Sequence, residues 1–130
     1  MRVSLVIDCI NPEHLAPFWE AALQYRQVGS LPNYRVLAPR QDGDHGPVLI
    51  LQQVPEPRQG KNRLHLDLHP DDSAATIKAL TALGASVRGD RVFLEDISWQ
   101  VMADPEGNEF CVVDHGVAPR LTGHSVDVGG

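Results

Sequence analysis

The order of predicted secondary-structure elements repeats once along the chain, and this repeat restricts the folds open to it. Residues 3–10 are rich in apolar and β-branched side chains and predict a strand. Asn11 is a suitable N-cap, and Pro12 fits the first turn of a helix that carries Phe18 and Trp19 on its apolar face. Three strand-like segments follow, at about 25–29, 34–38 and 48–54.

The second half of the chain shows the same order. Leu64 to Leu68 alternates apolar and polar residues, which predicts a strand with the leucines on one face and His65 and Asp67 on the other. Residues 70–73 open a second helix, which Gly84 is expected to end. The side chains expected to face the sheet from this helix are Ala74, Ile77, Leu80 and Leu83. Further strands are predicted near 86–88, 91–96, 99–103 and 109–113.

A strand, a helix and about three strand signals, found in both halves of the chain, predict an α+β fold of two βαβββ units. We expect a curved, mostly antiparallel sheet around a cavity, with the helices on its other face. The 130 residues suit a single domain. Its expected parts are a first unit at 1–55, a linker at 56–62, a second unit at 63–115 and a tail at 116–130.

The composition of the chain argues against some classes of binding partner. The formal charge of −6, with no cluster of Lys or Arg, argues against nucleic acid and anionic lipid as partners. No apolar run is long enough for a membrane span, and the N-terminus does not resemble a signal peptide, so a cytoplasmic protein with Cys9 and Cys111 as free thiols is expected. A small molecule or a second copy of the chain is the expected partner.

Four segments follow one another in order and in register: Val6 to Phe18-Trp19, Lys61 to Leu68, Leu83-Gly84-Ala85, and Trp99 to Val112 with its Asp104-Pro105-Glu106-Gly107-Asn108 turn. Together they resemble the glyoxalase-like domains of the vicinal-oxygen-chelate superfamily. The resemblance covers about residues 3–113 and implies the fold described above. Relatives include glyoxalase I, extradiol dioxygenases, fosfomycin-resistance transferases and bleomycin-binding proteins, so the fold alone does not define a reaction.

The resemblance also implies positions for a divalent metal. Its metal-dependent members use a histidine in the first strand, a histidine opening the second unit and a glutamate in the last strand. These positions hold Ser4, His65 and Cys111 here, and a fourth carboxylate position corresponds to Gln52. Because only His65 is retained, no cofactor is expected, and a noncanonical divalent metal at His65 is the alternative.

Strand alternation predicts a polar row on the sheet face opposite the helices. The expected ligand-binding residues are Ser4, Asp8, Gln52, His65, Asp67, Trp99, Glu109 and Cys111. Asp8, His65 and Glu109 are the candidate acid, base or hydrogen-bonding groups. The alternative reading pairs Asp67 and Glu109 with Arg63 or Arg91 as structural charges and treats Trp99 as edge packing. The remaining histidines, including His69 and His115, are expected to be surface residues.

Three functions remain open at this stage. The first is a bleomycin-resistance-like protein that binds a small polar or aromatic molecule without a metal. The second is an enzyme of the lyase, isomerase or dioxygenase kind that uses His65 with acidic residues or a noncanonical metal. The third is a dimerising or regulatory module without catalysis. A homodimer is expected, because related proteins complete their cavities by pairing such units.

Overall fold

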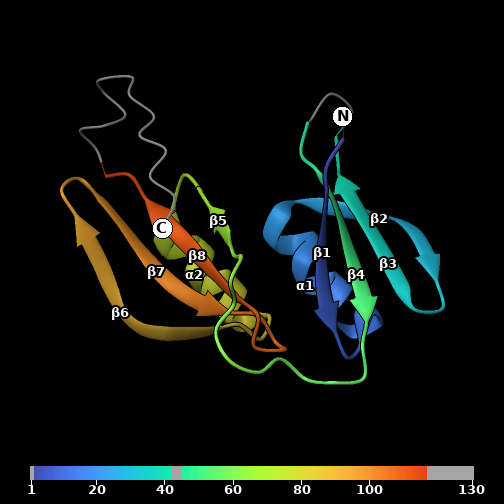
Figure 1. Ribbon diagram of the computed structural model, residues 1–130. Coiled ribbons are helices and arrows are strands. Elements are labelled where there is room, and N and C mark those ends of the chain that lie inside the picture. The colour runs from blue at the N-terminus through green and yellow to red at the C-terminus, as the bar shows by residue number, and fades with distance from the viewer. Residues whose placement is uncertain (1, 42–44, 117–130) are drawn as a thin grey trace. The chain divides into compact units, whose positions relative to one another are not determined.

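The computed structural model describes residues 2–41 and 45–116. These residues form two compact units, unit 1 up to Gly60 and unit 2 from Lys61 onward. Unit 1 contains β1 (Ser4–Cys9), α1 (Pro12–Leu23), β2 (Tyr25–Leu31), β3 (Tyr34–Pro39) and β4 (Val48–Gln53). Its four strands form one sheet in the order β1-β4-β3-β2 (Figure 1). β1 pairs with β4 in parallel and the other neighbours are antiparallel.

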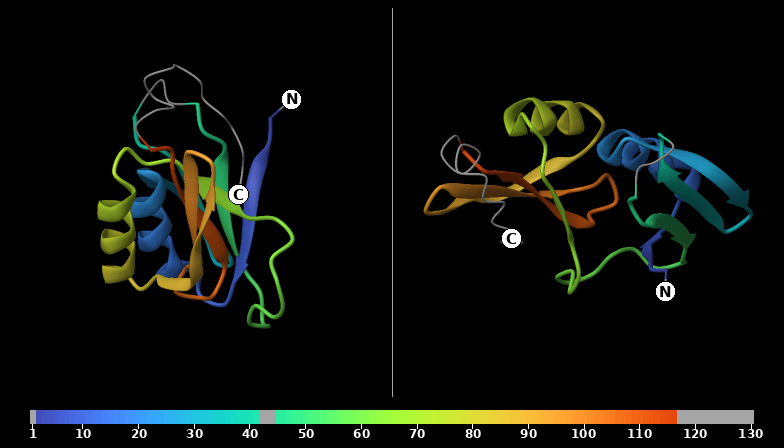
Figure 2. Two further views of the ribbon diagram at one scale, coloured as in Figure 1. Left: turned by 90° about the vertical axis from the view of Figure 1, so that its left-hand side faces the viewer. Right: turned by 90° about the horizontal axis from the view of Figure 1, so that it is seen from above.

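Unit 2 repeats this arrangement. It contains β5 (Leu66–Leu68), α2 (Ser73–Ala82), β6 (Ser86–Leu94), β7 (Ile97–Ala103) and β8 (Glu109–Asp114). The strand order is β5-β8-β7-β6, with β5 parallel to β8. In each unit the helix lies against one face of its own sheet (Figure 2). The predicted α+β fold of two mostly antiparallel βαβββ units is therefore confirmed.

Both helices begin where the capping residues of the sequence predict. The Asn11 side chain accepts a hydrogen bond from the His14 backbone N–H, and Asp72 does the same for Ala75. The apolar side of α1 is buried through Leu15, Phe18 and Trp19. Capping therefore determines where each chain segment turns into a helix, and burial of the aromatic pair holds α1 in place.

Several details differ from the sequence-based expectations. β5 begins only at Leu66, and Leu64 is 74% exposed instead of facing the helices. Ala74 and Leu83 are also exposed. Leu80 is therefore the main buried apolar residue of α2, and Ile77 is partly buried. A helix this short can turn only a narrow side toward its sheet.

The segments expected as separate strands at 86–88 and 91–96 form one strand, β6. Its pairing with β7 shifts between Arg88 and Val92, which marks a bulge, and Gly89 adopts a positive φ of 68° there. The chain then turns at Glu95, whose φ is 53°. A bulge interrupts the two-residue alternation, and for this reason the pattern suggested two strands where there is one.

The turn between β7 and β8 positions the strand that carries Glu109 and Cys111. Asp104 is buried, and its Oδ1 accepts hydrogen bonds from the backbone N–H groups of Glu106 and Asn108. Its Oδ2 accepts a third hydrogen bond from the Asn108 side chain. This carboxylate therefore closes the predicted Asp-Pro-Glu-Gly-Asn turn and fixes the register of β8.

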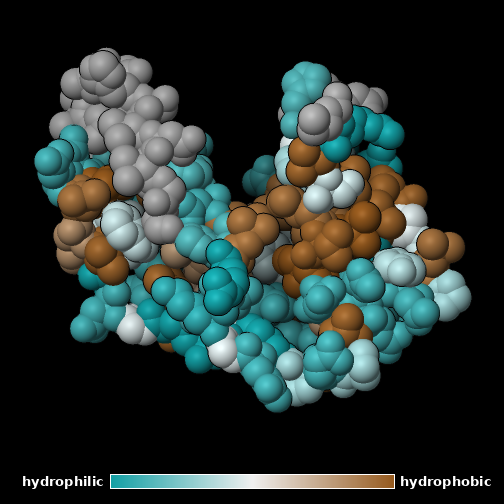
Figure 3. Space-filling model, viewed as in Figure 1, coloured by the Kyte–Doolittle hydropathy of each residue, from teal (hydrophilic) through white to brown (hydrophobic). Residues whose placement is uncertain are grey.

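The sheet of unit 1 carries apolar side chains on the face that α1 does not cover. Val6, Val28, Leu31 and Tyr34 are all exposed, and Figure 3 shows apolar surface gathered over this unit. Along β1 the exposed residues alternate with Leu5 and Ile7, which are partly buried, so the two faces of the strand differ as predicted. Within the described residues, neither helix is long or apolar enough to cross a membrane.

Candidate functional site

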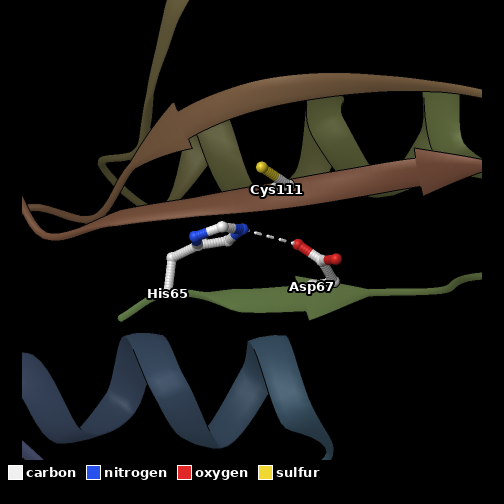
Figure 4. Close-up of side chains that lie close together, drawn as sticks. All are labelled: His65, Asp67 and Cys111. Carbon is white, nitrogen blue, oxygen red and sulfur yellow. Dashed lines mark ion pairs between the residues drawn. The ribbon is translucent and has the colours of Figure 1, made fainter. Parts of the chain in front are cut away.

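Three side chains of unit 2 that differ in chemistry meet on one face of its sheet. His65 lies just before β5, Asp67 lies within β5, and Cys111 lies opposite Asp67 on the neighbouring strand β8. Their ligand-type atoms are all within 4.8 Å of one another. The His65 Nε2 and Asp67 Oδ1 atoms are 3.1 Å apart (Figure 4). We call these three residues the HDC cluster.

The three residues of the HDC cluster differ in their exposure to solvent. The His65 side chain is 35% exposed and that of Asp67 is 13% exposed, whereas Cys111 is buried. Asp67 thus lies between an accessible imidazole and a buried thiol. The 3.1 Å contact holds the Nε2 side of the His65 ring against Asp67, while the ring itself stays partly exposed to solvent.

The environment of Cys111 raises the pKa of its thiol to about 11. Burial is the largest cause, followed by the negative charge of Asp67, a hydrogen bond with Asp67 and the charge of Glu109. All four favour the neutral thiol over the thiolate. Cys111 therefore carries its proton at neutral pH and is a poor nucleophile.

We expect the alkylation of Cys111 by iodoacetamide to be slow and to rise with pH toward a midpoint near 11. At pH 8 the thiolate fraction, and with it the rate, should be about two orders of magnitude below that of an ordinary thiol. The measurement uses a Cys9→Ser background, so that a single thiol is followed by mass spectrometry. Asp67→Asn should speed the reaction at pH 9, because it removes the charge next to the sulfur.

The same protein in urea provides the control, because its thiol should then titrate as in an unfolded chain. A midpoint below pH 9 in the folded protein would contradict the described environment of Cys111. Equal rates for Asp67→Asn and its parent would show that Asp67 does not act on the thiol.

Two other predicted site residues of unit 2 lie on the same sheet face as the HDC cluster. Glu109 precedes Cys111 by two residues on β8, and Trp99 of β7 pairs with Val113, two residues after Cys111. Residues opposite each other on paired strands project from one face, so Trp99, Cys111 and Glu109 share it. The expected roles of Trp99 as an aromatic wall and of Glu109 as an acid or base stay predictions.

The alternative interpretation pairs Asp67 and Glu109 with Arg63 or Arg91 as structural charges. The contacts of these side chains in the structure differ from one to the next. Asp67 forms its ion pair with His65. The guanidinium of Arg91 donates a hydrogen bond to Ser98 Oγ. The backbone N–H of Glu109 donates to the side-chain oxygen of Asn62, which links the start of β8 to the segment before β5. Sequence reasoning did not single out Asn62.

The remaining predicted residues belong to unit 1. Asp8 of β1 lies directly opposite Gln52 of β4, and Ser4 lies near the start of β1 opposite Val48. Ser4 and Asp8 are exposed and Gln52 is partly buried. The structure thus brings Asp8 and Gln52 together within the unit 1 sheet, four residues along β1 from Ser4. Their predicted part in ligand binding remains a prediction.

His69 and His115 lie at the surface of unit 2, as expected, but their rings are also in contact. His69 Nδ1 and His115 Nε2 are 2.8 Å apart, although the two residues are 46 positions apart in the chain. His69 follows His65 and Asp67 with strand-like alternation, and His115 directly follows β8. The alternation was visible in the sequence, but the partner strand that brings His115 alongside was not.

The residues present do not fit the metal that the resemblance implies. Ser4 and Gln52 offer neutral oxygens, and Cys111 stands in place of a carboxylate with a thiol that holds its proton. The HDC cluster still gathers three donor atoms, one each from a histidine, an aspartate and a cysteine. Since thiolate is the metal-binding form of cysteine, a metal there would have to displace a tightly held proton.

The sequence pattern of the family described as "Glyoxalase-like domain" matches residues 4–113. No curated protein sequence matches the chain significantly. Many solved structures share the fold at low sequence identity. One is a glyoxalase/bleomycin resistance protein/dioxygenase family enzyme from Burkholderia phytofirmans, with 15% identity and a TM-score of 0.68, covering 85% of this chain and 94% of that chain.

Two further solved structures share this fold. A fosfomycin resistance protein from Listeria monocytogenes, complexed with Mn(II) and dihydroxypropylphosphonic acid, has 11% identity and a TM-score of 0.69, covering 90% of each chain. A protein from Agrobacterium tumefaciens has 18% identity and a TM-score of 0.67, covering 86% of this chain and 96% of that chain. At such identities these likenesses concern the fold alone.

Proposed function

Because the chain belongs to the glyoxalase-like domain family, we propose that it binds a small organic molecule and that this binding needs no metal. The observation that carries the proposal is the His65–Asp67 pair, whose 3.1 Å contact holds a half-exposed imidazole against a largely buried carboxylate. The pair presents a fixed hydrogen-bonding group on a sheet face. A small-molecule site needs a few hydrogen-bonding groups of this kind next to apolar side chains.

The chemistry of the pair suggests what it would recognise. Asp67 holds the Nε2 side of the His65 ring, and Glu109 adds a second carboxylate two residues from Cys111 on the same face. Acceptors and negative charge favour a ligand that donates hydrogen bonds or carries a basic nitrogen. Trp99, on this face, would stack against an aromatic part of such a ligand. A polar, amine-bearing aromatic molecule is therefore the proposed class.

A metal-dependent enzyme is the second candidate, and the three donor atoms of the HDC cluster within 4.8 Å favour it. In this alternative the cluster would hold a divalent ion through a set different from the one the family resemblance implies. Metal analysis of protein purified without chelator distinguishes the two: an ion that is lost in both His65→Ala and Cys111→Ser supports the enzyme. The neighbour with Mn(II) concerns another protein with 11% identity and does not decide between them.

We expect His65→Ala to weaken ligand binding about tenfold or more, because a buried hydrogen-bonding group of the ligand that loses its partner costs about 1–3 kcal/mol. Bleomycin, fosfomycin and a panel of amine-bearing aromatic compounds serve as probes, first by thermal shift and then by calorimetric titration. Bleomycin and fosfomycin are chosen because the names of structural neighbours mention resistance to them.

His14→Ala is the matched control, since His14 is an exposed histidine of α1 in unit 1. It should bind each probe like the unchanged chain, and circular dichroism should show that both variants remain folded. Equal affinities for His65→Ala and His14→Ala would place the binding site elsewhere. The expected homodimer, which bears on whether a second chain completes the site, stays a prediction.

A further inference from the structure

Two imidazoles meet at the end of the parallel pair of strands in unit 2. His69 directly follows β5, and His115 directly follows β8. Their Nδ1 and Nε2 atoms are 2.8 Å apart, and their ring centroids are separated by 5.0 Å. Neither residue occupies a position that the family resemblance assigns to a metal ligand, and neither belongs to the HDC cluster.

The backbone holds both histidines in place. Leu68 and Val112 are paired in the ladder between β5 and β8, so the residues that follow them leave the sheet side by side. Pro70 restricts His69 to an extended conformation.

The turn after β8 is held by contacts of the residues on both sides of His115. Asp114 accepts hydrogen bonds from Ser73 Oγ and from the Gly116 backbone N–H. Gly116 has a φ of 68°, and a Cβ there would come within 2.9 Å of the Asp96 carbonyl oxygen. His115 therefore lies between two residues whose positions are set by other parts of unit 2.

We propose that His69 and His115 form a two-imidazole site for a divalent transition ion, with Cu²⁺ and Ni²⁺ as the ions that fit best. Neutral imidazole is a good ligand for both. Two metal–nitrogen bonds of about 2.0–2.1 Å at a right angle place their nitrogens about 2.9 Å apart, whereas a tetrahedral angle needs about 3.3 Å. The observed 2.8 Å is the distance of the hydrogen bond between the rings, and it is also close to the separation needed at a right angle, which tetragonal Cu²⁺ and Ni²⁺ complexes use.

Metal binding to the two histidines does not require either ring to lose a proton. In the free protein one ring nitrogen donates a hydrogen bond to the other, and which one donates depends on the tautomer. When an ion binds, this proton moves to the other nitrogen of its own ring, and both facing lone pairs become ligands. Both rings must also rotate, because in the hydrogen-bonded pair the two nitrogens face each other and not a common ion. Water fills the other coordination positions.

The test titrates the full, untagged chain with CuCl₂ by calorimetry and records the electron paramagnetic resonance spectrum of the complex. We expect one ion per chain, with couplings from imidazole nitrogen. His69→Gln and His115→Gln should each weaken binding about 100-fold, because each converts a chelate into a single ligand. The double variant should be little worse than either single one, since the second histidine alone contributes weakly.

Two further variants separate this site from the rest of the molecule. His14→Gln changes an exposed histidine on α1 and should leave the Cu²⁺ affinity unchanged. His65→Ala should also leave it unchanged, so that failure of the two-imidazole site and failure of the proposed small-molecule site give different results. Retention of full affinity in His69→Gln or His115→Gln, or loss of affinity in His65→Ala, would overturn the proposal.

Discussion

Phe110→Ala is expected to lower the free energy of unfolding by about 3–5 kcal/mol. Phe110 is fully buried on β8, which lies between β5 and β7 in the sheet of unit 2. Truncation removes an aromatic ring from a position that strands cover on both sides, and the close-packed interior can collapse only partly into the space left. Urea unfolding of the full chain, followed by circular dichroism, measures the loss.

The matched control is Phe93→Ala in the same unit. Phe93 is 74% exposed on the edge strand β6, so its truncation should change the free energy of unfolding by less than about 0.5 kcal/mol. Similar losses for the two variants would mean that the core of unit 2 is not where the structure places it.

Asp104→Ala is expected to have an effect of similar size, about 3 kcal/mol or more, through a different mechanism. The side chain is only 3% exposed and accepts three hydrogen bonds in the turn before β8. Alanine leaves the backbone N–H groups of Glu106 and Asn108 without their acceptor, and each buried unsatisfied donor costs about 1–3 kcal/mol. Urea unfolding again provides the measurement.

Asp104→Asn and Asp90→Ala serve as comparisons. The amide of Asp104→Asn keeps one carbonyl oxygen for the backbone donors, so its loss should be smaller than that of alanine. Asp90 is exposed on β6, and its replacement should be nearly neutral. If Asp104→Ala unfolded like Asp90→Ala, the carboxylate would not be holding the turn together.

The features that the sequence predicted well depend on residues close together in the chain. The Asn11 cap, the Pro12 start of α1 and the turn from Asp104 to Asn108 are each formed by side chains within a few positions of their partners. Local hydrogen bonds of this kind leave a recognisable pattern in the sequence. The repeat of strand and helix signals extended these local patterns to the order of the elements, except that two predicted strands proved to be the one strand β6.

The features that were missed depend on pairing between distant segments. The bulge of β6 is a property of its register with β7, and the meeting of His69 with His115 follows from the parallel pairing of β5 with β8. In the same way, β5 proved shorter than its alternating pattern because Leu64, although apolar, has no surface to cover it. Periodicity describes which residues share a face and not what lies against that face.

The candidate site was predicted only in part for the same reason. Alternation placed His65 and Asp67 on one face, but the direct contact between their side chains depends on rotamers that a pattern does not contain. Cys111 was recognised as the replacement of a carboxylate position. Its raised thiol pKa follows from burial and from Asp67 on the adjacent strand, which become visible only in the folded chain.

Calorimetric titration of chelator-treated protein, with and without added Mn²⁺ or Zn²⁺, tests metal-free ligand binding most directly. The probe is the compound with the largest thermal shift among bleomycin, fosfomycin and the amine-bearing aromatic panel. We predict an affinity that added metal does not change and that His65→Ala lowers about tenfold or more. Binding that occurs only after metal is added, or that His65→Ala leaves intact, would contradict metal-free binding at the His65–Asp67 pair.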